Sequence, residues 1–138
     1  MSFDLVIRGG TVATGADVFR ADIGIRNERV VAIADRIVDG RRVIDATGKI
    51  VLPGGIDAHC HLDQSQAPGL ASKGARMADG FRSGSISAAF GGTTTIVPFC
   101  VQHRGQSLTA AVADYHERAA GQTVGDYAFH LIISDPTP

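Results

Sequence analysis

The sequence predicts an α/β protein in which a β-rich segment, residues 1–53, precedes a segment of alternating strands and helices, residues 54–138. Three observations predict this organisation. The first segment contains short apolar runs separated by glycine turns. The second contains three apolar or β-branched runs and, between them, two stretches with the apolar spacing of a helix. The pattern changes at Pro53-Gly54-Gly55, which is a strong turn signal.

The first segment is predicted to form short strands, separated by turns at Gly9-Gly10 and at Asn27-Glu28. Residues 21–26 alternate apolar and polar side chains, as a half-exposed strand does. The expected strands are residues 3–8, 11–14, 21–26, 29–34, 42–45 and 49–52. We expect a small antiparallel sandwich or sheet layer. About fifty residues bury too little apolar surface to be stable alone, so this layer should dock on a larger body.

The second segment is predicted to run strand, helix, strand, helix, strand, with parallel strands and right-handed crossovers. The strands are expected at residues 56–61, 93–99 and 126–133, with a long loop over 62–78. This order fits a doubly wound sheet or an eight-stranded barrel. No phosphate-binding glycine motif follows a strand.

Two helices are predicted between these strands. The first should be capped by Asp79 and stopped by Gly91-Gly92, and the second capped by Ser107 and closed by Gly121. Their apolar contacts are expected at Phe81, Ile86, Ala89 and Phe90 in the first helix, and at Leu108, Ala111, Val112, Tyr115 and Ala119 in the second. The strand at residues 93–99 has the composition of a strand buried on both faces.

Composition and charge exclude several classes of protein. Thirteen basic and fourteen acidic side chains give a net charge of −1, which offers no electrostatic footprint for nucleic acid or an anionic membrane. No apolar run approaches the roughly 18 residues of a membrane-spanning helix, and the N-terminus lacks the features of a secretory signal. Cys60 and Cys100 are too few for a disulfide framework. We therefore expect a cytoplasmic protein with no nucleic-acid or membrane partner.

The residues that carry chemistry are His59 and His61, at the end of the first strand of the second segment. Residues two apart in a strand point to the same face, so the two imidazoles should project together. Neutral imidazole is a ligand for several divalent metals, and zinc is the first candidate. The carboxyl end of a strand is also where barrel enzymes place their active sites. The pair is therefore predicted to bind a metal ion.

Two neighbours of the pair have other predicted roles. Cys60 should point away from the histidines and pack as a buried thiol. Asp57 shares the face of the histidines, and two interpretations of it stay open. It either orients an imidazole through a hydrogen bond or serves as a hydrogen-bond partner at the end of the strand.

The remaining histidines and lysines are predicted to have no metal role. His103 is expected in a solvated loop, His116 on the surface of the second helix, and His130 in the core with a hydrogen bond. Lys49 and Lys73 are the only lysines, and neither is placed to bridge two metal ions.

Three segments resemble a known family. Residues 44–63, which contain Pro53-Gly54-Gly55 and His59-Cys60-His61, resemble the entry to the barrel in the amidohydrolase superfamily. Residues 88–96 resemble the second strand of the dihydropyrimidinase and hydantoinase family with the helix end before it, and residues 126–130 resemble its third strand. The similarity runs through the whole chain in order, but it matches only the N-terminal portion of the family.

The resemblance implies an α/β fold, the start of a (β/α)8 TIM-like barrel preceded by part of a small β-sandwich. In the family the sandwich is built from both ends of the chain. Residues 1–53 would be its N-terminal part, and residues 54–138 the first three strands and two helices of the barrel. A complete barrel takes about 250 residues, so the chain looks truncated.

The resemblance also implies a metal centre. Members of the family hold two metal ions, usually zinc, bridged by a carboxylated lysine and a hydroxide. By the motif, His59 and His61 would bind the more buried ion. The bridging lysine, two further histidines and the catalytic aspartate belong to later strands. No catalytic residue is therefore expected within this chain, and the motif assigns it no substrate-binding residue.

The implied function is hydrolytic opening of a small cyclic amide to a ureido or carbamoyl acid, in a homo-oligomer when full length. This chain alone is expected to be inactive. Two alternatives stay open: a single-metal deaminase of the same superfamily, which His59-Cys60-His61 and the two residues after it also resemble, and a non-catalytic dihydropyrimidinase-like scaffold. Residues 63–72 would help to shape the substrate pocket. Asp63 replaces an arginine of dihydroorotases and would repel a substrate carboxylate, which argues against that activity.

Overall fold

The computed structural model describes residues 2–64 and 77–136. The chain divides into two compact units, Met1–Pro53 and Gly54–Pro138, and each is described by itself. Most of the loop predicted at 62–78, including Lys73, lies outside the described residues. Among the described helices, none is both long enough and apolar enough to cross a membrane.

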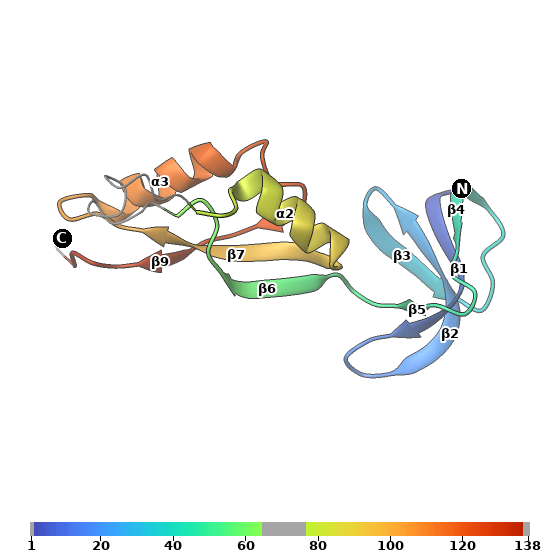
Figure 1. Cartoon of the computed structure of the whole chain (residues 1–138). Coiled ribbons are helices and arrows are strands. Elements are labelled where there is room, and N and C mark those ends of the chain that lie inside the picture. Colours follow the sequence, from blue (N-terminus) through green and yellow to red (C-terminus); the bar gives the residue numbers. More distant parts are fainter. Residues whose placement is uncertain (1, 65–76, 137–138) are drawn as a thin grey trace. The chain divides into compact units, whose positions relative to one another are not determined.

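The first unit is a single five-stranded sheet with the strand order β3-β2-β1-β4, and β5 also pairs with β1 (Figure 1). Its strands are β1 (Phe3–Ala13), β2 (Val18–Arg26), β3 (Arg29–Ala34), β4 (Gly40–Asp45) and β5 (Ile50–Val51). The prediction of an antiparallel layer is wrong for part of the sheet. β1 pairs antiparallel with β2 but parallel with β4 and β5, because residues 35–39 carry the chain from one edge of the sheet to the other.

Gly9 and Gly10 do not form the predicted turn. β1 runs through both glycines, and its pairing with β2 shifts register between Ile7 and Gly10. Gly9 has a φ of 73°, which glycine adopts without steric cost, and its N–H donates to Asp22 Oδ1 at 2.8 Å. The two glycines therefore make a bulge that bends a continuous strand. The predicted turn at Asn27-Glu28 is confirmed, since both residues have positive φ, as a two-residue hairpin turn requires.

Asp22 is a buried carboxylate that ties β2 to two other segments. Its Oδ1 accepts from Gly9 N–H, its Oδ2 accepts from Ile37 N–H at 2.9 Å, and Arg8 lies 3.9 Å from Oδ2. Burial by itself would raise the pKa of this carboxyl. The two hydrogen bonds lower it, as do the positive charges of Arg8 and Arg36, and the resulting pKa lies below the ordinary value.

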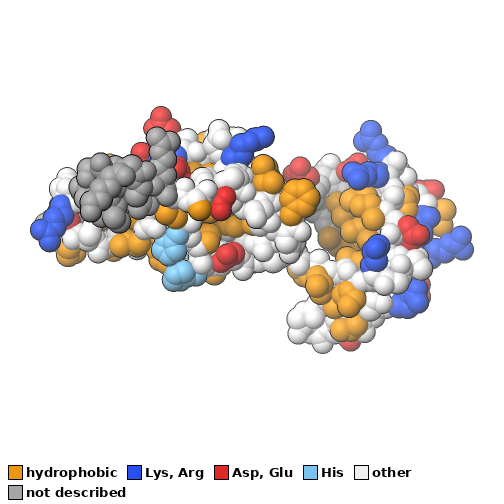
Figure 2. Space-filling model, in the orientation of Figure 1, with side chains coloured by type: hydrophobic (Ala, Val, Ile, Leu, Met, Phe, Trp, Pro, Cys, Tyr) orange, Lys and Arg blue, Asp and Glu red, His pale blue; other side chains and the backbone are white. Residues whose placement is uncertain are grey.

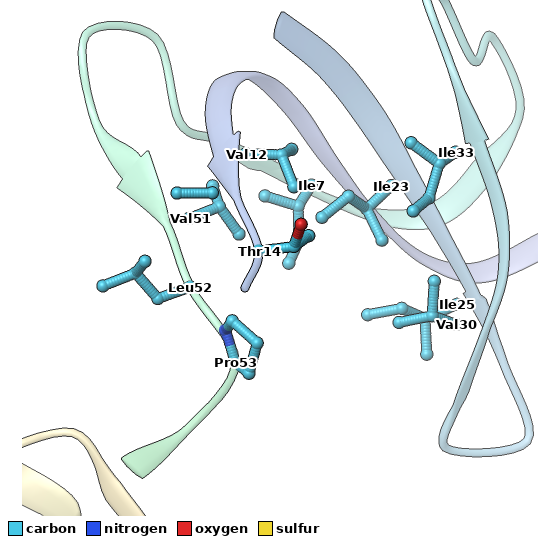
Figure 3. Close-up of a pocket in the computed structure, with 11 residues that line it drawn as sticks. Ile7, Val12, Thr14, Ile23, Ile25, Val30, Ile33, Val51, Leu52 and Pro53 are labelled. Atoms are coloured by element: carbon cyan, nitrogen blue, oxygen red, sulfur yellow. The ribbon is translucent and has the colours of Figure 1, made fainter. Parts of the chain in front are cut away.

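An apolar hollow opens on the first unit. Figure 3 shows the side chains around it, which come from β1, β2 and β3 and from the segment that contains β5. They include Ile7, Val12, Ile23, Ile25, Val30 and Ile33. Val30 is 58% exposed and Ile33 is 50% exposed, so a substantial part of this apolar lining remains open to water.

The second unit is a parallel sheet with the order β6-β7-β8, in which β9 also pairs with β7. Its described elements are β6 (Gly55–Cys60), α2 (Phe81–Phe90), β7 (Thr93–Val101), α3 (Leu108–Ala119), β8 (Asp126–Tyr127) and β9 (His130–Ile132). Both helices lie on the same face of the sheet (Figure 1). The predicted alternation of parallel strands and helices is thus confirmed for the described residues.

The third predicted strand, residues 126–133, is interrupted between β8 and β9, and Pro98 explains the interruption. The carbonyl of Ile96 accepts from Ala128 N–H at 3.1 Å, so the backbone of Ile96 faces this neighbouring strand. Two residues further on, Pro98 faces the same way but has no N–H to donate. The hydrogen-bond ladder therefore lacks a donor where residues 128–129 separate the two short strands.

Helix α2 differs from its prediction at its N-cap and at the C-terminal end of its apolar face. Gly80, not Asp79, is the N-cap, and its N–H donates to Ser83 Oγ at 3.2 Å. Phe81 is buried at 3% exposure, whereas Phe90 is 91% exposed, so the expected contact at Phe90 is wrong. The helix ends at Gly91-Gly92 as predicted.

Helix α3 follows its prediction closely. Ser107 Oγ accepts from Ala110 N–H at 3.1 Å, which confirms the predicted cap. Ala111, Tyr115 and Ala119 are buried, although the expected contact at Leu108 is exposed. The core of the unit consists of Phe81, Cys100, Tyr115 and Ala119, with Leu62, Tyr127 and Phe129 packed against it.

In β7 the residues that face this core, Ile96, Pro98 and Cys100, are buried, whereas the alternate residues are only half-buried. The prediction that this strand is buried on both faces is therefore wrong within this unit.

We predict that Asp22→Asn destabilises the first unit by about 1–3 kcal/mol near neutral pH, because the amide leaves one buried backbone N–H without an acceptor. Since the folded-state pKa of Asp22 is lowered, the stability that its carboxylate adds is present above the ordinary pKa of 3.8 and is lost as the pH falls through the folded-state pKa. Urea titrations followed by the amide NMR signal of Ile23 measure both effects. A difference between wild type and variant that stays constant down to about pH 3 would contradict this account.

Candidate metal centre

The carboxyl end of β6 is irregular. Asp57 pairs with Ile96 and Cys60 pairs with Pro98, so three steps along β6 match two steps along β7. One extra residue is therefore accommodated in β6 between Asp57 and Cys60, which is a β-bulge. His59 lies inside this stretch, and bulges are common where a strand re-aims a side chain.

Two side chains satisfy backbone groups within the bulge. Asp57 Oδ1 accepts from the N–H of His59 at 3.0 Å. His130 Nε2 lies 3.0 Å from the carbonyl oxygen of Ala58, and because a carbonyl can only accept, this nitrogen of His130 carries the proton. The bulge is thus held by one hydrogen bond from within β6 and by a second from β9.

The imidazoles of His59 and His61 lie together. Their ring centroids are 5.6 Å apart, with the planes at 68°, and Figure 2 shows histidine side chains gathered at one place on the surface of the second unit. The ring of Phe99 on β7 stacks on His61 at 5.1 Å and meets His59 edge-on at 4.6 Å. The ring centroid of His130 lies 5.0 Å from that of Phe99. Phe99 is therefore the common packing partner of three histidine rings.

The pair offers two exposed nitrogen ligands to a metal ion. Imidazole suits zinc and several other divalent ions, so the donor chemistry fits the predicted metal. Among the described residues, no group of three or more histidine, cysteine, aspartate or glutamate side chains is arranged to hold a metal. The described residues thus offer a pair of imidazoles with no third such side chain arranged beside them.

The neighbours of the pair have defined partners. The carboxylate of Asp57 accepts a hydrogen bond from the backbone of His59. Asp57 therefore serves as a hydrogen-bond partner at the end of the strand, which was one of the two interpretations left open. Cys60 is half-buried. Burial and the charge of Asp57 raise the pKa of its thiol, and a hydrogen bond with the backbone of Val97 lowers it, so that the pKa is raised overall.

The other histidines lie apart from the pair or are engaged elsewhere. His103 is exposed in the loop after β7, as predicted, and its backbone N–H donates to Gln106 Oε1 at 3.1 Å. His116 is exposed on α3, also as predicted. His130 is hydrogen-bonded as predicted, but it is not a core residue in mid-strand: it opens β9 and is exposed. Lys49 directly precedes β5 in the first unit.

Asp63 is engaged in an ion pair that the sequence did not indicate. Its carboxylate accepts from Arg118 Nη1 at 2.7 Å. The negative charge of Asp63 is therefore compensated by a cation, and repulsion of a substrate carboxylate by this residue is not supported.

A buried glutamine, also missed in the sequence, joins the carboxyl ends of β7 and β9. Gln102 is 3% exposed, and its amide nitrogen donates to the carbonyls of Gln106 at 2.8 Å and Asp135 at 3.0 Å. Its amide oxygen accepts from the N–H groups of Ser134 and Asp135. All the hydrogen-bonding capacity of this side chain is used to fix two loops at the edge where the histidine pair lies.

Comparison with known proteins gives a consistent result, although no family model matches the sequence. The chain is 44% identical over 133 residues to D-hydantoinase of Geobacillus stearothermophilus, a match that covers 96% of this chain and 27% of that protein. It is 36% identical over 142 residues to dihydropyrimidinase 1 of Caenorhabditis briggsae, which covers 100% of this chain and 28% of that protein. The solved structure of D-hydantoinase from Bacillus sp. AR9 is 50% identical with a TM-score of 0.86, over 96% of this chain and 27% of that one.

The chain is similar along nearly its whole length to D-hydantoinases and dihydropyrimidinases. The predicted resemblance is confirmed, and the chain matches the N-terminal part of its relatives. It spans just over a quarter of their length.

We predict that both thiols react slowly with iodoacetamide in the folded chain. Burial raises the pKa of Cys100 to about 11, with a smaller lowering by Arg118 and a raising by Asp114, so at about pH 8 its thiolate fraction is roughly a hundredfold below that of an ordinary cysteine. The raised pKa of Cys60 acts in the same direction. Alkylation followed by mass spectrometry, with urea-unfolded chain as the control, measures the rates, and rapid labelling of folded Cys60 would contradict the prediction.

Proposed function

We propose that this chain is the N-terminal part of a metal-dependent cyclic amidase, which hydrolyses the ring C–N bond of a hydantoin or dihydropyrimidine to give a ureido or carbamoyl acid. The observation that carries the proposal is the convergence of His59 and His61, with ring centroids 5.6 Å apart, in a chain 44% identical to a D-hydantoinase. The names of the relatives supply the substrate class, and the exposed imidazole pair supplies the chemistry.

The proposal includes an arrangement of domains. Residues 54–138 would begin a (β/α)8 TIM-like barrel, which is supported by the parallel pairing of β6, β7, β8 and β9 and by the position of both helices on one face of the sheet (Figure 1). Residues 1–53 would form the N-terminal part of a β-sandwich. The apolar hollow of that unit supports this assignment, because a second sheet layer would cover side chains such as Val30 and Ile33 that are now exposed (Figure 3).

His59 and His61 would hold a divalent metal, which we propose to be zinc, as one of two ions in the complete centre. When bound, such ions lower the pKa of a water molecule and polarise the carbonyl that it attacks. Each imidazole would bind the ion through a ring nitrogen that carries no proton. Phe99 keeps the two rings in place by contact with both. The bridging lysine and the catalytic base would be contributed by later strands.

For the whole protein we propose a cytoplasmic homo-oligomer that acts on a small molecule. Resemblance to the family supports this part of the proposal. Cys60 and Cys100 are both free thiols, which is the state expected in a reducing compartment.

A chimera tests the proposal. Joining residues 1–138 of this chain to the remainder of the Geobacillus stearothermophilus D-hydantoinase should give an enzyme that opens the rings of hydantoin or dihydrouracil. His59→Ala or His61→Ala in the chimera should lower kcat/KM by about a hundredfold or more, because a metal ligand is lost. His116→Ala, an exposed histidine on α3, is the matched control and should leave kcat/KM within about threefold.

The product decides between the alternatives. Release of ammonia without a ureido acid would favour the deaminase over the cyclic amidase. A folded chimera with no metal and no turnover would favour the non-catalytic scaffold. Either result, or full activity of the His59→Ala chimera, would overturn the proposal.

We also predict that the 138-residue chain alone has no ring-opening activity above that of its His59→Ala variant. Two imidazoles can hold a metal weakly, but they supply neither the second ion nor the base that moves the proton. A colorimetric assay for the ureido acid measures this, and turnover above the variant would contradict the prediction.

A further inference from the structure

His61 has a hydrogen-bond partner three residues further along the chain. Its Nδ1 lies 2.7 Å from Oε1 of Gln64. An amide oxygen only accepts hydrogen bonds, so Nδ1 carries the proton and Nε2 of the neutral ring keeps its lone pair. Imidazoles that bind metals commonly donate their other ring N–H to an oxygen acceptor in this way. The contact with Gln64 thus leaves His61 in the tautomer that binds a metal through Nε2.

The chain between these two residues is held in a tight turn. Asp63 has a φ of 48°, a left-handed conformation that aspartate adopts more readily than most residues. Its N–H donates to the carbonyl of Asp79 at 3.1 Å. Leu62 packs against the core of the unit, so close to Gly84 that a Cβ on that glycine would overlap its side chain. The turn is therefore anchored at Leu62 and at its left-handed residue, Asp63.

Arg118 clamps the turn from helix α3. Its Nη1 donates both to the carbonyl of Asp63 at 2.6 Å and to the carboxylate of Asp63 at 2.7 Å. Its Nη2 donates to Asp114 Oδ2 at 2.9 Å, and its Cζ lies 4.0 Å from the ring centroid of Tyr115, which is buried at 1% exposure. A planar guanidinium can make all these contacts at once, whereas an ammonium group cannot.

We propose that Gln64 is a positioning residue for His61 and that the Arg118–Asp63 ion pair holds Gln64 against the ring. The linkage runs from α3 through Asp63 to Gln64 and then to Nδ1 of His61, and it fixes both the orientation and the tautomer of the metal-binding ring. This inference rests on the proposed function, because the ligand that the ring is prepared for is the divalent metal of the amidase centre.

The tautomer can be measured in the metal-free chain. Long-range ¹H–¹⁵N correlation spectra of the labelled 138-residue protein, recorded in mildly alkaline buffer, should show His61 protonated at Nδ1. Gln64→Met removes the acceptor at similar size and should move the proton towards Nε2. Gln64→Glu retains an oxygen acceptor and should keep the wild-type tautomer. Gln122→Met, which changes an exposed glutamine after α3, is the matched control.

Zinc affinity provides the second readout. In competition with a chromophoric chelator, Gln64→Met and Arg118→Met should weaken zinc binding by about 10–100-fold, whereas Gln64→Glu and Gln122→Met should bind as the wild type does. Circular dichroism checks that each variant is folded. If Gln64→Met does not fold, Gln64→Glu keeps the test decisive.

The outcomes separate the inference from the proposed function. Protonation of wild-type His61 at Nε2, or unchanged zinc affinity in folded Gln64→Met, would overturn the positioning role. Loss of binding in Gln64→Glu equal to that in Gln64→Met would overturn it as well, because the acceptor would then be irrelevant. If the wild-type chain shows the expected tautomer but binds no zinc, the proposed metal centre is contradicted. The linkage from Arg118 to His61 would then not serve metal binding.

Discussion

The irregular pairing of β6 with β7 sets the position of the histidine pair, and two side chains pair with backbone groups inside the bulge. The carboxylate of Asp57 accepts a hydrogen bond from the backbone N–H of His59, and His130 on β9 donates one to the carbonyl of Ala58. A bulge without these bonds would leave backbone groups unpaired at a cost comparable to that of a lost hydrogen bond. With them, the strand delivers two imidazoles to one side of the sheet against the ring of Phe99.

The hydantoinase relatives and the local geometry support the same conclusion from independent directions. The chain is similar to hydantoinases over nearly its whole length, and the ring of Phe99 contacts both His59 and His61. The chain carries the first two ligands of the proposed centre and the loops fixed by Gln102 at the same edge of the sheet. It spans about a quarter of the length of its relatives. The proposal for the whole protein therefore assigns to other parts of the chain the remaining metal ligands, the catalytic base and a second sheet layer over the apolar hollow of the first unit.

Local patterns predicted the elements well and the connections between them less well. The spacing of His59 and His61 predicted correctly that their rings lie together, because a single residue separates them in the chain, even though His59 lies inside the irregular stretch of the strand. The cap at Ser107 was correct for a similar reason, since capping involves only neighbouring residues. Gly9-Gly10 was misassigned because a glycine pair serves equally in a turn or a bulge. Long-range pairs such as Arg118 with Asp63, 55 residues apart, follow from no periodicity in a single sequence.

The central claim is that two imidazoles converge on a single cation, and a cobalt titration tests it most directly. Co²⁺ is paramagnetic and binds the same kind of nitrogen ligand as zinc, so nuclei close to the ion respond first in NMR spectra. The ring signals of His59 and His61 should shift or broaden together at the lowest Co²⁺ concentrations, while those of His103 and His116 stay unchanged. A response at His103 or His116 that precedes any change at the pair would contradict it.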